Sequence, residues 1–358
     1  MAVKGITFMN KKFLILVIAL QILVLIFMSA EREFILLFGK NVRLRTVPVD
    51  PYDPFRGEFV ALNYDISFIQ LDIIKDPTID IESFNSPFYV LLKENEDGIW
   101  DIKNCSLTKP PNSELFIRGR IDRHSYYNDK YLHLKYGIEK FFVQQGKGLE
   151  IEKKARDKGN IRIPLEVNVA IGNSGIAVAK SMEWSPIGVG VEVLERPQLR
   201  NLSGRNERNS NSEMEPPIRK SPKIKLTLKN CSEKVLGIII LPDYASFELL
   251  SSERSTKNFI FRKTLNQNIK IQDSDLKLLK PQEKIDVIFD LADPRWFVKN
   301  KKNEYVEIGD ISNDSWGNMI RIRYKSPLRK ECNHLKHADI TWYGTLKSPN
   351  VSVSGNID

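Results

Sequence analysis

The longest apolar stretch of the chain runs from Phe13 to Ala30 and is interrupted only by Gln21 and Ser29. As an α-helix these 18 residues would be about 27 Å long, close to the roughly 30 Å hydrocarbon core of a bilayer. Three lysines precede the stretch, and two glutamates follow it. Because Lys and Arg concentrate on the cytoplasmic side, the pattern predicts a transmembrane anchor at 13–30, a cytoplasmic tail at 1–12 and an extracytoplasmic remainder.

A cleaved signal sequence is the alternative for this stretch. A signal peptidase requires small residues at the first and third positions before its cut. Ala30 satisfies the first requirement, but Met28 is too large for the third, and no lipoprotein cysteine ends the stretch. The sequence therefore favours an uncleaved anchor in the cytoplasmic membrane. A buried core helix fits less well, because such helices are rarely apolar on every side.

Beyond Gly39 the apolar positions change to a period of two, which is typical of strands. The clearest run, residues 59–68, places Val60, Leu62 and Tyr64 on one face. Three prolines in the seven residues 48–54 stiffen the loop before it. Shorter strands between Gly, Pro, Asn and Asp signals, with one helix after residue 148, complete a β-rich α+β domain at 31–195.

Residues 196–222 have no periodic apolar face and are rich in Asn, Ser, Arg and Glu, so they are predicted to be a flexible linker. Alternation resumes at residue 223 in about seven strands, which is typical of a β-sandwich. Pro-Gln-Glu before one strand, and Trp-Tyr-Gly-Thr-Leu-Lys-Ser before the last, are similar to bacterial immunoglobulin-like domains. The predicted fold is therefore mainly β: an N-terminal transmembrane helix, an α+β domain, and an immunoglobulin-like β-sandwich at 223–358.

The composition narrows the classes of partner. The net charge is +9, but the basic residues are scattered and are not interleaved with aromatic residues along one face. Nucleic-acid surfaces usually show such clustering, so no nucleic-acid partner is predicted. The three cysteines form no CxxC or zinc-finger spacing. Cys231 and Cys332 are expected at the same end of the sandwich and are a candidate disulfide in an oxidising compartment; unbridged thiols are the alternative.

Residues 57–64 read GEFVALNY and match the pattern Gly-Asp-Tyr-x-x-Leu-x-Tyr, with Glu58 for Asp and Phe59 for Tyr. With the preceding PVDPYDPFRG, the later YGIEKFFVQQGKG and the single apolar segment, residues from about 10 to 185 resemble the GDYXXLXY family of bacterial membrane-anchored proteins. No activity is established for that family as a group. Its members are often encoded beside polytopic membrane proteins, so the resemblance implies such a protein as partner, with the bilayer contacted through Phe13–Ala30.

The proline-rich loop, the GEFVALNY motif and the YGIEKFFVQQGKG segment supply the candidate contact or corner residues. These are Asp50, Asp53, Arg56, Gly57, Glu58, Phe59, Leu62, Tyr64, Glu139 and Lys140. The three carboxylates of the proline-rich loop are ligands that a hard cation accepts, but their spacing is not that of an EF-hand, and turn chemistry explains Asp beside Pro. The loop's Arg-Gly-Glu corner and the Glu139–Lys140 pair are interpreted as internal ion pairs. No metal or cofactor is predicted.

An enzymatic alternative comes from a second similarity. A proline-containing loop, then Arg-Gly-acidic and a hydrophobic strand, resembles the catalytic β-fold of membrane signal peptidases. Those enzymes need a Ser nucleophile and a Lys base held near neutrality by burial. Here the comparable place is 48–51, Pro-Val-Asp-Pro, which has no Ser. A shared fold would therefore favour a degenerate relative over an active hydrolase.

Two further alternatives concern the second domain. Trp296, Trp316 and Trp342 could form an exposed platform for a carbohydrate, although core packing explains them as well. The segment from Cys332 to His337 holds three metal-ligand residue types without a fourth nearby, which favours ordinary loop residues. With two β domains on a stalk and no catalytic constellation, the sequence predicts a non-catalytic binding or accessory subunit of an envelope complex.

Overall fold

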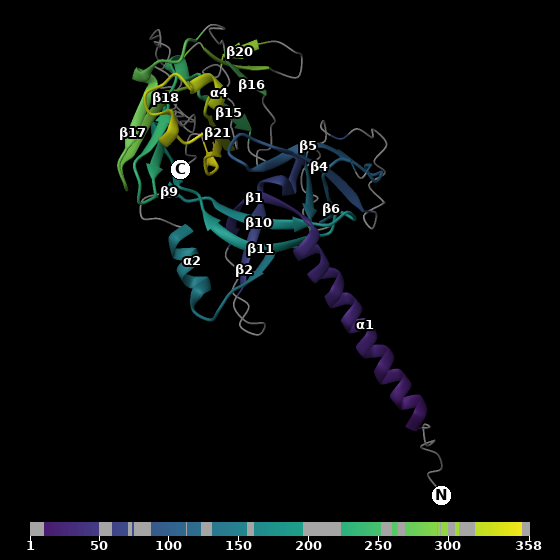
Figure 1. Cartoon of the computed structure of the whole chain (residues 1–358). Helices are drawn as coiled ribbons and strands as arrows, with labels where there is room; N and C mark the ends of the chain where they lie inside the picture. The colour runs from purple at the N-terminus through teal and green to yellow at the C-terminus, as the bar shows by residue number, and fades with distance from the viewer. Residues whose placement is uncertain are drawn as a thin grey trace, which may run out of the picture.

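The structure is a computed structural model of the chain. It describes residues 11–49, 59–70, 74, 87–111, 113–122, 131–155, 161–195, 223–251, 260–263, 269–291, 293, 295–299, 305–307 and 319–352. One long helix leads into a succession of antiparallel strands, and it projects away from them (Figure 1). This arrangement confirms the predicted mainly β fold with an N-terminal apolar helix.

The elements of the first unit follow one another between residues 11 and 184. They are α1 (Lys11–Phe38), β1 (Lys40–Val49), β2 (Phe59–Tyr64), η1 (Asp65–Ser67), β3 (Phe68–Gln70), β4 (Phe88–Glu94), β5 (Trp100–Ser106), β6 (Phe116–Ile121), β7 (Tyr131–Lys135), β8 (Lys140–Phe142), α2 (Lys147–Ala155), β9 (Ile161–Arg162), β10 (Leu165–Ile171) and β11 (Ala177–Trp184). The short helix α2 lies where the sequence predicts one.

The second unit contains the remaining elements. They are β12 (Ile187–Glu195), β13 (Lys223–Asn230), β14 (Leu236–Ile239), η4 (Pro242–Tyr244), β15 (Phe247–Ser251), β16 (Ile260–Lys263), η5 (Asp273–Asp275), β17 (Leu276–Leu279), β18 (Lys284–Asp290), β19 (Trp296–Lys299), β20 (Tyr305–Glu307), β21 (Met319–Lys325), α4 (Arg329–Cys332), η6 (Ala338–Ile340), β22 (Thr345–Lys347) and β23 (Val351–Ser352).

Two five-stranded sheets enclose the core of the first unit, in the orders β11-β10-β1-β2-β8 and β3-β7-β6-β4-β5. The predicted strand 59–68 is correct in its inward face but too long. It ends at Tyr64, and the 3-10 turn η1 carries the chain from one sheet into the other. Ile66 in that turn stays buried, so the alternating pattern records burial on both sides of the break.

The second unit has a four-stranded sheet in the order β18-β13-β12-β9 and another in the order β15-β21-β22, with β23 also paired to β21. The remaining strands form a two-stranded sheet β14-β17 and a three-stranded sheet β16-β19-β20. Aliphatic residues of β13 and aromatic residues of β15 and β21 share one core. The immunoglobulin-like topology stays a prediction.

The boundary between the units lies earlier than the sequence predicts. β12 was expected to close the first domain, but it pairs with β13 over Ile187–Glu195 and its Ile187 and Val189 belong to the second core. Its other neighbour is β9, which precedes the last hairpin of the first unit. The segment 196–222, predicted as the linker, lies outside the described residues. Because β12 runs beside strands from both sides, the two units share a sheet.

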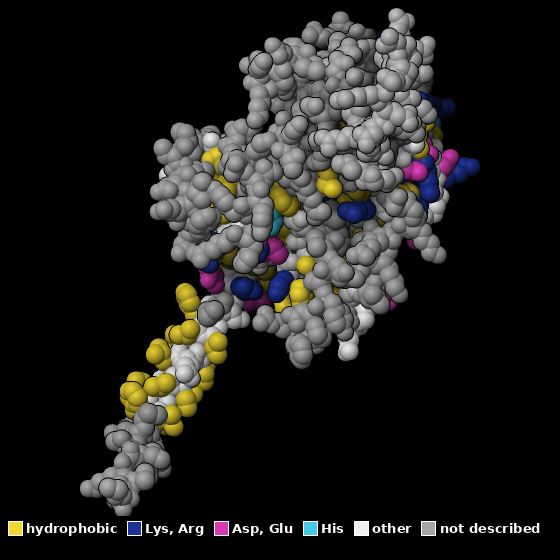
Figure 2. All heavy atoms as spheres, turned by 180° about the vertical axis from the view of Figure 1, so that it is seen from behind, with side chains coloured by type: hydrophobic (Ala, Val, Ile, Leu, Met, Phe, Trp, Pro, Cys, Tyr) yellow, Lys and Arg dark blue, Asp and Glu magenta, His cyan; other side chains and the backbone are white. Residues whose placement is uncertain are grey.

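The helix α1 has 28 residues, and its part from Phe13 to Phe38 is long and apolar enough to cross a membrane, as an anchor or a signal sequence is. Its hydrophobic side chains cover the surface of the projecting rod (Figure 2). The helix ends at Phe38, and the N–H of the following Gly39 donates to the Ile35 carbonyl at 2.8 Å. One N-terminal helix of this kind fits a single-pass membrane protein.

Candidate functional site

The two family-like motifs lie side by side in the structure, because β2 pairs with β8. The Leu62 N–H donates to the Glu139 carbonyl at 2.8 Å, one residue beyond the paired strands. Tyr64, at the end of β2, donates its hydroxyl proton to the Ile138 carbonyl at 3.0 Å. Burial raises the pKa of this phenol far above its ordinary value, and the nearby Glu139 carboxylate raises it further. Tyr64 is therefore a neutral donor that fixes one motif to the other.

Glu139 holds the turn before β8. Its carboxylate accepts the backbone N–H groups of Tyr136 and Gly137, and Gly137 has a φ of 83°, where glycine is favoured. Tyr136 in turn donates its hydroxyl proton to the Ile66 carbonyl in η1. The predicted Glu139–Lys140 ion pair is therefore wrong: the carboxylate binds backbone donors, which at a tight turn have no strand partner.

Lys140 points to the opposite face of β8 and places its ammonium 4.8 Å from the centre of the Phe59 ring. Such a cation–π contact is worth about 0.5–1 kcal/mol at an exposed site. Phe59 is buried, and its ring lies 6.1 Å from that of Phe142 across the strand pair. Phe142 is 67% exposed on the edge strand of the sheet. We call Phe59, Lys140 and Phe142 the motif corner. It presents one aromatic ring, that of Phe142, and one ammonium, that of Lys140, outward.

The structure brings together half of the predicted site: Phe59, Leu62, Tyr64, Glu139 and Lys140. The other half, made up of Asp50, Asp53, Arg56, Gly57 and Glu58, lies outside the described residues. In the described half, Tyr64 and Glu139 bond to backbone groups, and Lys140 lies over the Phe59 ring. These contacts stabilise the corner where β2 meets β8.

A second cluster, which sequence analysis missed, joins the two units. Arg45 on β1 lies 3.0 Å from a Glu166 carboxylate oxygen on β10 and 3.3 Å from the Asp97 carboxylate, and all three side chains are buried. The same guanidinium donates to the Thr345 carbonyl of the second unit, and the Asp97 carboxylate accepts the Thr345 N–H at 3.4 Å. We call these four residues the inter-unit cluster.

Arg43 supports the cluster from two residues away. Its guanidinium lies 3.5 Å from Glu166 and donates to the Asp97 carbonyl, but it is about one-third exposed. The sequence signal was the alternation of Arg43 and Arg45 with apolar neighbours, which sequence analysis took only as the mark of a strand. The pairing of Arg45 with Glu166 across β1 and β10 gives the arginine its partner, and this register is not visible in one sequence.

A second ion pair between the units joins Asp65 in η1 to Lys347 in β22, at 3.3 Å. Burial alone would raise the pKa of the Asp65 carboxyl, but Lys347, Arg321 and Arg45 outweigh burial and hold the pKa below its usual value. Asp65 is therefore ionised at neutral pH. The backbone N–H of Arg329 also donates to a Glu96 carboxylate oxygen at 3.1 Å.

The candidate disulfide is not formed: Cys231 and Cys332 are both thiols. Cys332 lies in a small core cluster with Ile239 and Tyr343, and burial raises its pKa to about 11. Cys231 follows β13 and directs its Sγ toward the Lys229 carbonyl, at 3.6 Å. The sequence predicted that the two loops lie at the same end of a sandwich, but the two Sγ atoms are not bonded to each other.

Two further alternatives, the tryptophan platform and the metal site, can be compared with the described residues. Trp296 is buried in the second core, and the Trp342 ring lies 6.1 Å from Tyr324, so neither belongs to an exposed platform. Trp316 lies outside the described residues. Within the described ranges no group of three His, Cys, Asp or Glu residues is placed to hold a metal ion. His334 instead contacts the Ile271 carbonyl at 3.0 Å.

The described part of the chain forms a mainly β structure with one apolar N-terminal helix. Residues 21–182 match the family model described as GDYXXLXY protein, so this region belongs to that family, as the motifs predicted. No curated protein matches the chain. The matched range covers α1 from Gln21 onward and the rest of the first unit except the end of β11, and it leaves the second unit outside.

Proposed function

We propose that the chain is a membrane-anchored, non-catalytic binding or accessory subunit of a membrane or envelope complex, with its bulk outside the cytoplasm. The apolar helix supports the anchor, and the lysines before it support a cytoplasmic N-terminus. The family to which residues 21–182 belong has no established activity as a group.

The observation that carries the proposal is the exposed motif corner. The two motifs that mark the family meet at β2 and β8, and their buried groups stabilise each other. What remains outward is the Phe142 ring and the Lys140 ammonium, which lies over the buried Phe59 ring. Outside α1, Phe142 has the highest exposure among the exposed large apolar side chains of the described residues. Aromatic residues are enriched at protein interfaces, so a partner's surface is the environment this ring fits.

We infer that the partner is a polytopic membrane protein, as the family resemblance suggests. The attachment of the second unit to the first supports this role, because a partner bound to either unit would be held near the membrane. The inter-unit cluster and the Asp65–Lys347 pair provide that attachment.

Site-specific photo-cross-linking in native membranes tests the proposal. A benzophenone amino acid at Phe142 is expected to give one discrete cross-linked product with a membrane protein. The matched control is the same amino acid at Ile288, which is 52% exposed on β18 of the second unit and is expected to give none. Equal labelling at both positions, or none at Phe142, would count against a binding corner.

A further inference from the structure

The helix α1 continues beyond Ala30, where the anchor predicted from the sequence ends, as an exposed apolar turn. After Ala30 come three charged residues, and then Phe34, Leu37 and Phe38, which are 63%, 73% and 72% exposed. At 3.6 residues per turn these three lie within about 100° of one another on the helix. The two rings touch, with centroids 4.7 Å apart. We call these three residues the collar patch.

The collar patch lies on the same face as the apolar stripe of the span. Positions four, seven and eleven before Phe34 are Ala30, Phe27 and Leu23, which are apolar and exposed. The charged triplet interrupts the apolar sequence without breaking the helix. At 100° per residue Arg32 points to the opposite side, and Glu31 and Glu33 flank this face at about 60° and 100° from Phe34. The stripe that contacts lipid in the span therefore runs on into the collar.

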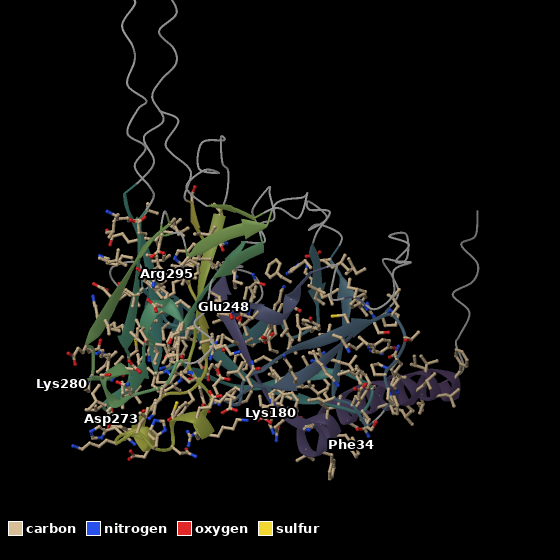
Figure 3. The ribbon with its side chains drawn as sticks, turned by 90° about the horizontal axis from the view of Figure 1, so that it is seen from above. Phe34, Lys180, Glu248, Asp273, Lys280 and Arg295 are labelled. Carbon is tan, nitrogen blue, oxygen red and sulfur yellow. The ribbon has the colours of Figure 1, made fainter. Side chains whose placement is uncertain are left out.

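The neighbouring face of the helix is docked, so α1 cannot rotate to bury the collar patch. Ile35 is 5% exposed, and its Cγ1 lies 3.0 Å from where a Cβ on Gly172 would be, in the β10–β11 turn. Lys180 on β11 donates to the Leu36 carbonyl at 3.3 Å and to the Asn41 side chain at 3.1 Å. In Figure 3, Phe34 lies on the outer side of α1 and Lys180 toward the strands.

The distance from the span fits the lipid headgroup layer. Counting about 1.5 Å per residue from Ala30, Phe34 stands about 6 Å and Phe38 about 12 Å along the helix axis. The interfacial layer is roughly 5–7 Å thick on each side of the hydrocarbon core. A tilt of about 20–40°, together with the lean of helical side chains toward the N-terminus, lowers both rings toward this layer.

We propose that the collar patch inserts into the headgroup region of the outer leaflet and holds α1 tilted, so that the first unit rests against the bilayer. This inference rests on the proposed membrane anchor. Lipid is the favoured occupant because the patch is continuous with the lipid-facing stripe and lies within one to two helical turns of the span. Aromatic rings at that depth are a common interfacial anchor.

The test uses the full chain in liposomes of phosphatidylethanolamine and phosphatidylglycerol, with p-benzoylphenylalanine at one position at a time. Illumination at Phe38 is expected to add the mass of one phospholipid, as seen by intact-protein mass spectrometry. Leu20, in the middle of the span, reports the anchor itself, and Ile288 is the exposed control away from α1. Adducts at Leu20 and Phe38 but not at Ile288 support the inference.

The other outcomes separate the two claims. Adducts at Leu20 without adducts at Phe38 overturn the collar contact and leave the anchor standing, whereas no adduct at Leu20 overturns the anchor. A dimer mass at Phe38 means that a second copy covers the patch, and in native membranes a cross-link to another protein means that a protein covers it; either result overturns lipid contact. With the probe at Leu37, a Phe34→Glu/Phe38→Glu variant is expected to lose the adduct, and Phe142→Glu is expected to keep it.

Discussion

At the residue scale, the polar side chains of the family motifs mainly form hydrogen bonds with backbone groups. Tyr64 donates to the Ile138 carbonyl, and Glu139 accepts two backbone N–H groups at a turn that bends through Gly137. A typical hydrogen bond contributes about 0.5–1.5 kcal/mol net to stability, so these side chains stabilise the place where β2 meets β8. A motif can thus be typical of a family because its side chains stabilise one corner of the fold.

Glu139→Ala tests this role. Loss of the carboxylate leaves two turn N–H groups without their acceptor, and we expect the free energy of unfolding to fall by about 1–3 kcal/mol. Urea denaturation of the full chain in detergent, followed by tryptophan fluorescence, measures it. The control is Glu150→Ala in α2, an exposed residue paired with Lys147, for which about 0–1 kcal/mol is expected. Equal effects would show that the turn does not depend on Glu139.

At the element scale, the sequence predicted most strands but not their partners. The alternation in residues 59–68 correctly predicted the buried face, yet the chain turns at Asp65–Ser67 because it must pass from one sheet to the other. β12 was expected in the first domain because it follows the first unit in sequence, but its alternating residues complete the second core. Periodicity reports burial, and it does not say against which sheet a strand is buried.

The joint between α1 and the sheet gives a prediction at this scale. Ile35→Ala removes the one residue of α1 that is buried among those described, and we expect the last turn to open about tenfold more often, equal to ~1.4 kcal/mol. Amide hydrogen exchange at Gly39, whose N–H donates to the Ile35 carbonyl, measures the opening. Leu37→Ala, on the exposed side of the same turn, is the control and should leave the exchange rate unchanged. An unchanged rate in Ile35→Ala would mean that the helix is held by other contacts.

At the scale of the whole molecule, buried charges fasten the second unit to the first. The candidate site inferred from sequence lay wholly in one domain, because pairing between distant charges is invisible without the fold. Arg45 and Glu166 are 121 residues apart, and Arg45 and Thr345 are 300 apart. Their approach depends on β1 pairing with β10 and on β22 lying beside the β4–β5 turn.

Arg45→Ala leaves Glu166 and Asp97 buried without their shared cation. Removal of one partner from a buried ion pair costs about 3–5 kcal/mol, so we expect a large drop in the unfolding midpoint and faster exchange of the Thr345 N–H. The matched control is Arg43→Ala, which touches the same two acidic residues from a more exposed position and should cost about 1 kcal/mol or less. A similar effect of both variants would contradict a buried fastening centred on Arg45.

We propose that this chain works by binding a membrane protein through the motif corner. Purification of the tagged full chain from native membranes in a mild detergent tests it most directly, with Phe142→Glu compared against Ile288→Glu. We expect one membrane protein to co-elute in fixed ratio with the unaltered chain and with Ile288→Glu, and to be lost with Phe142→Glu. Recovery of the bare chain in every case, or equal co-elution with both variants, would contradict it.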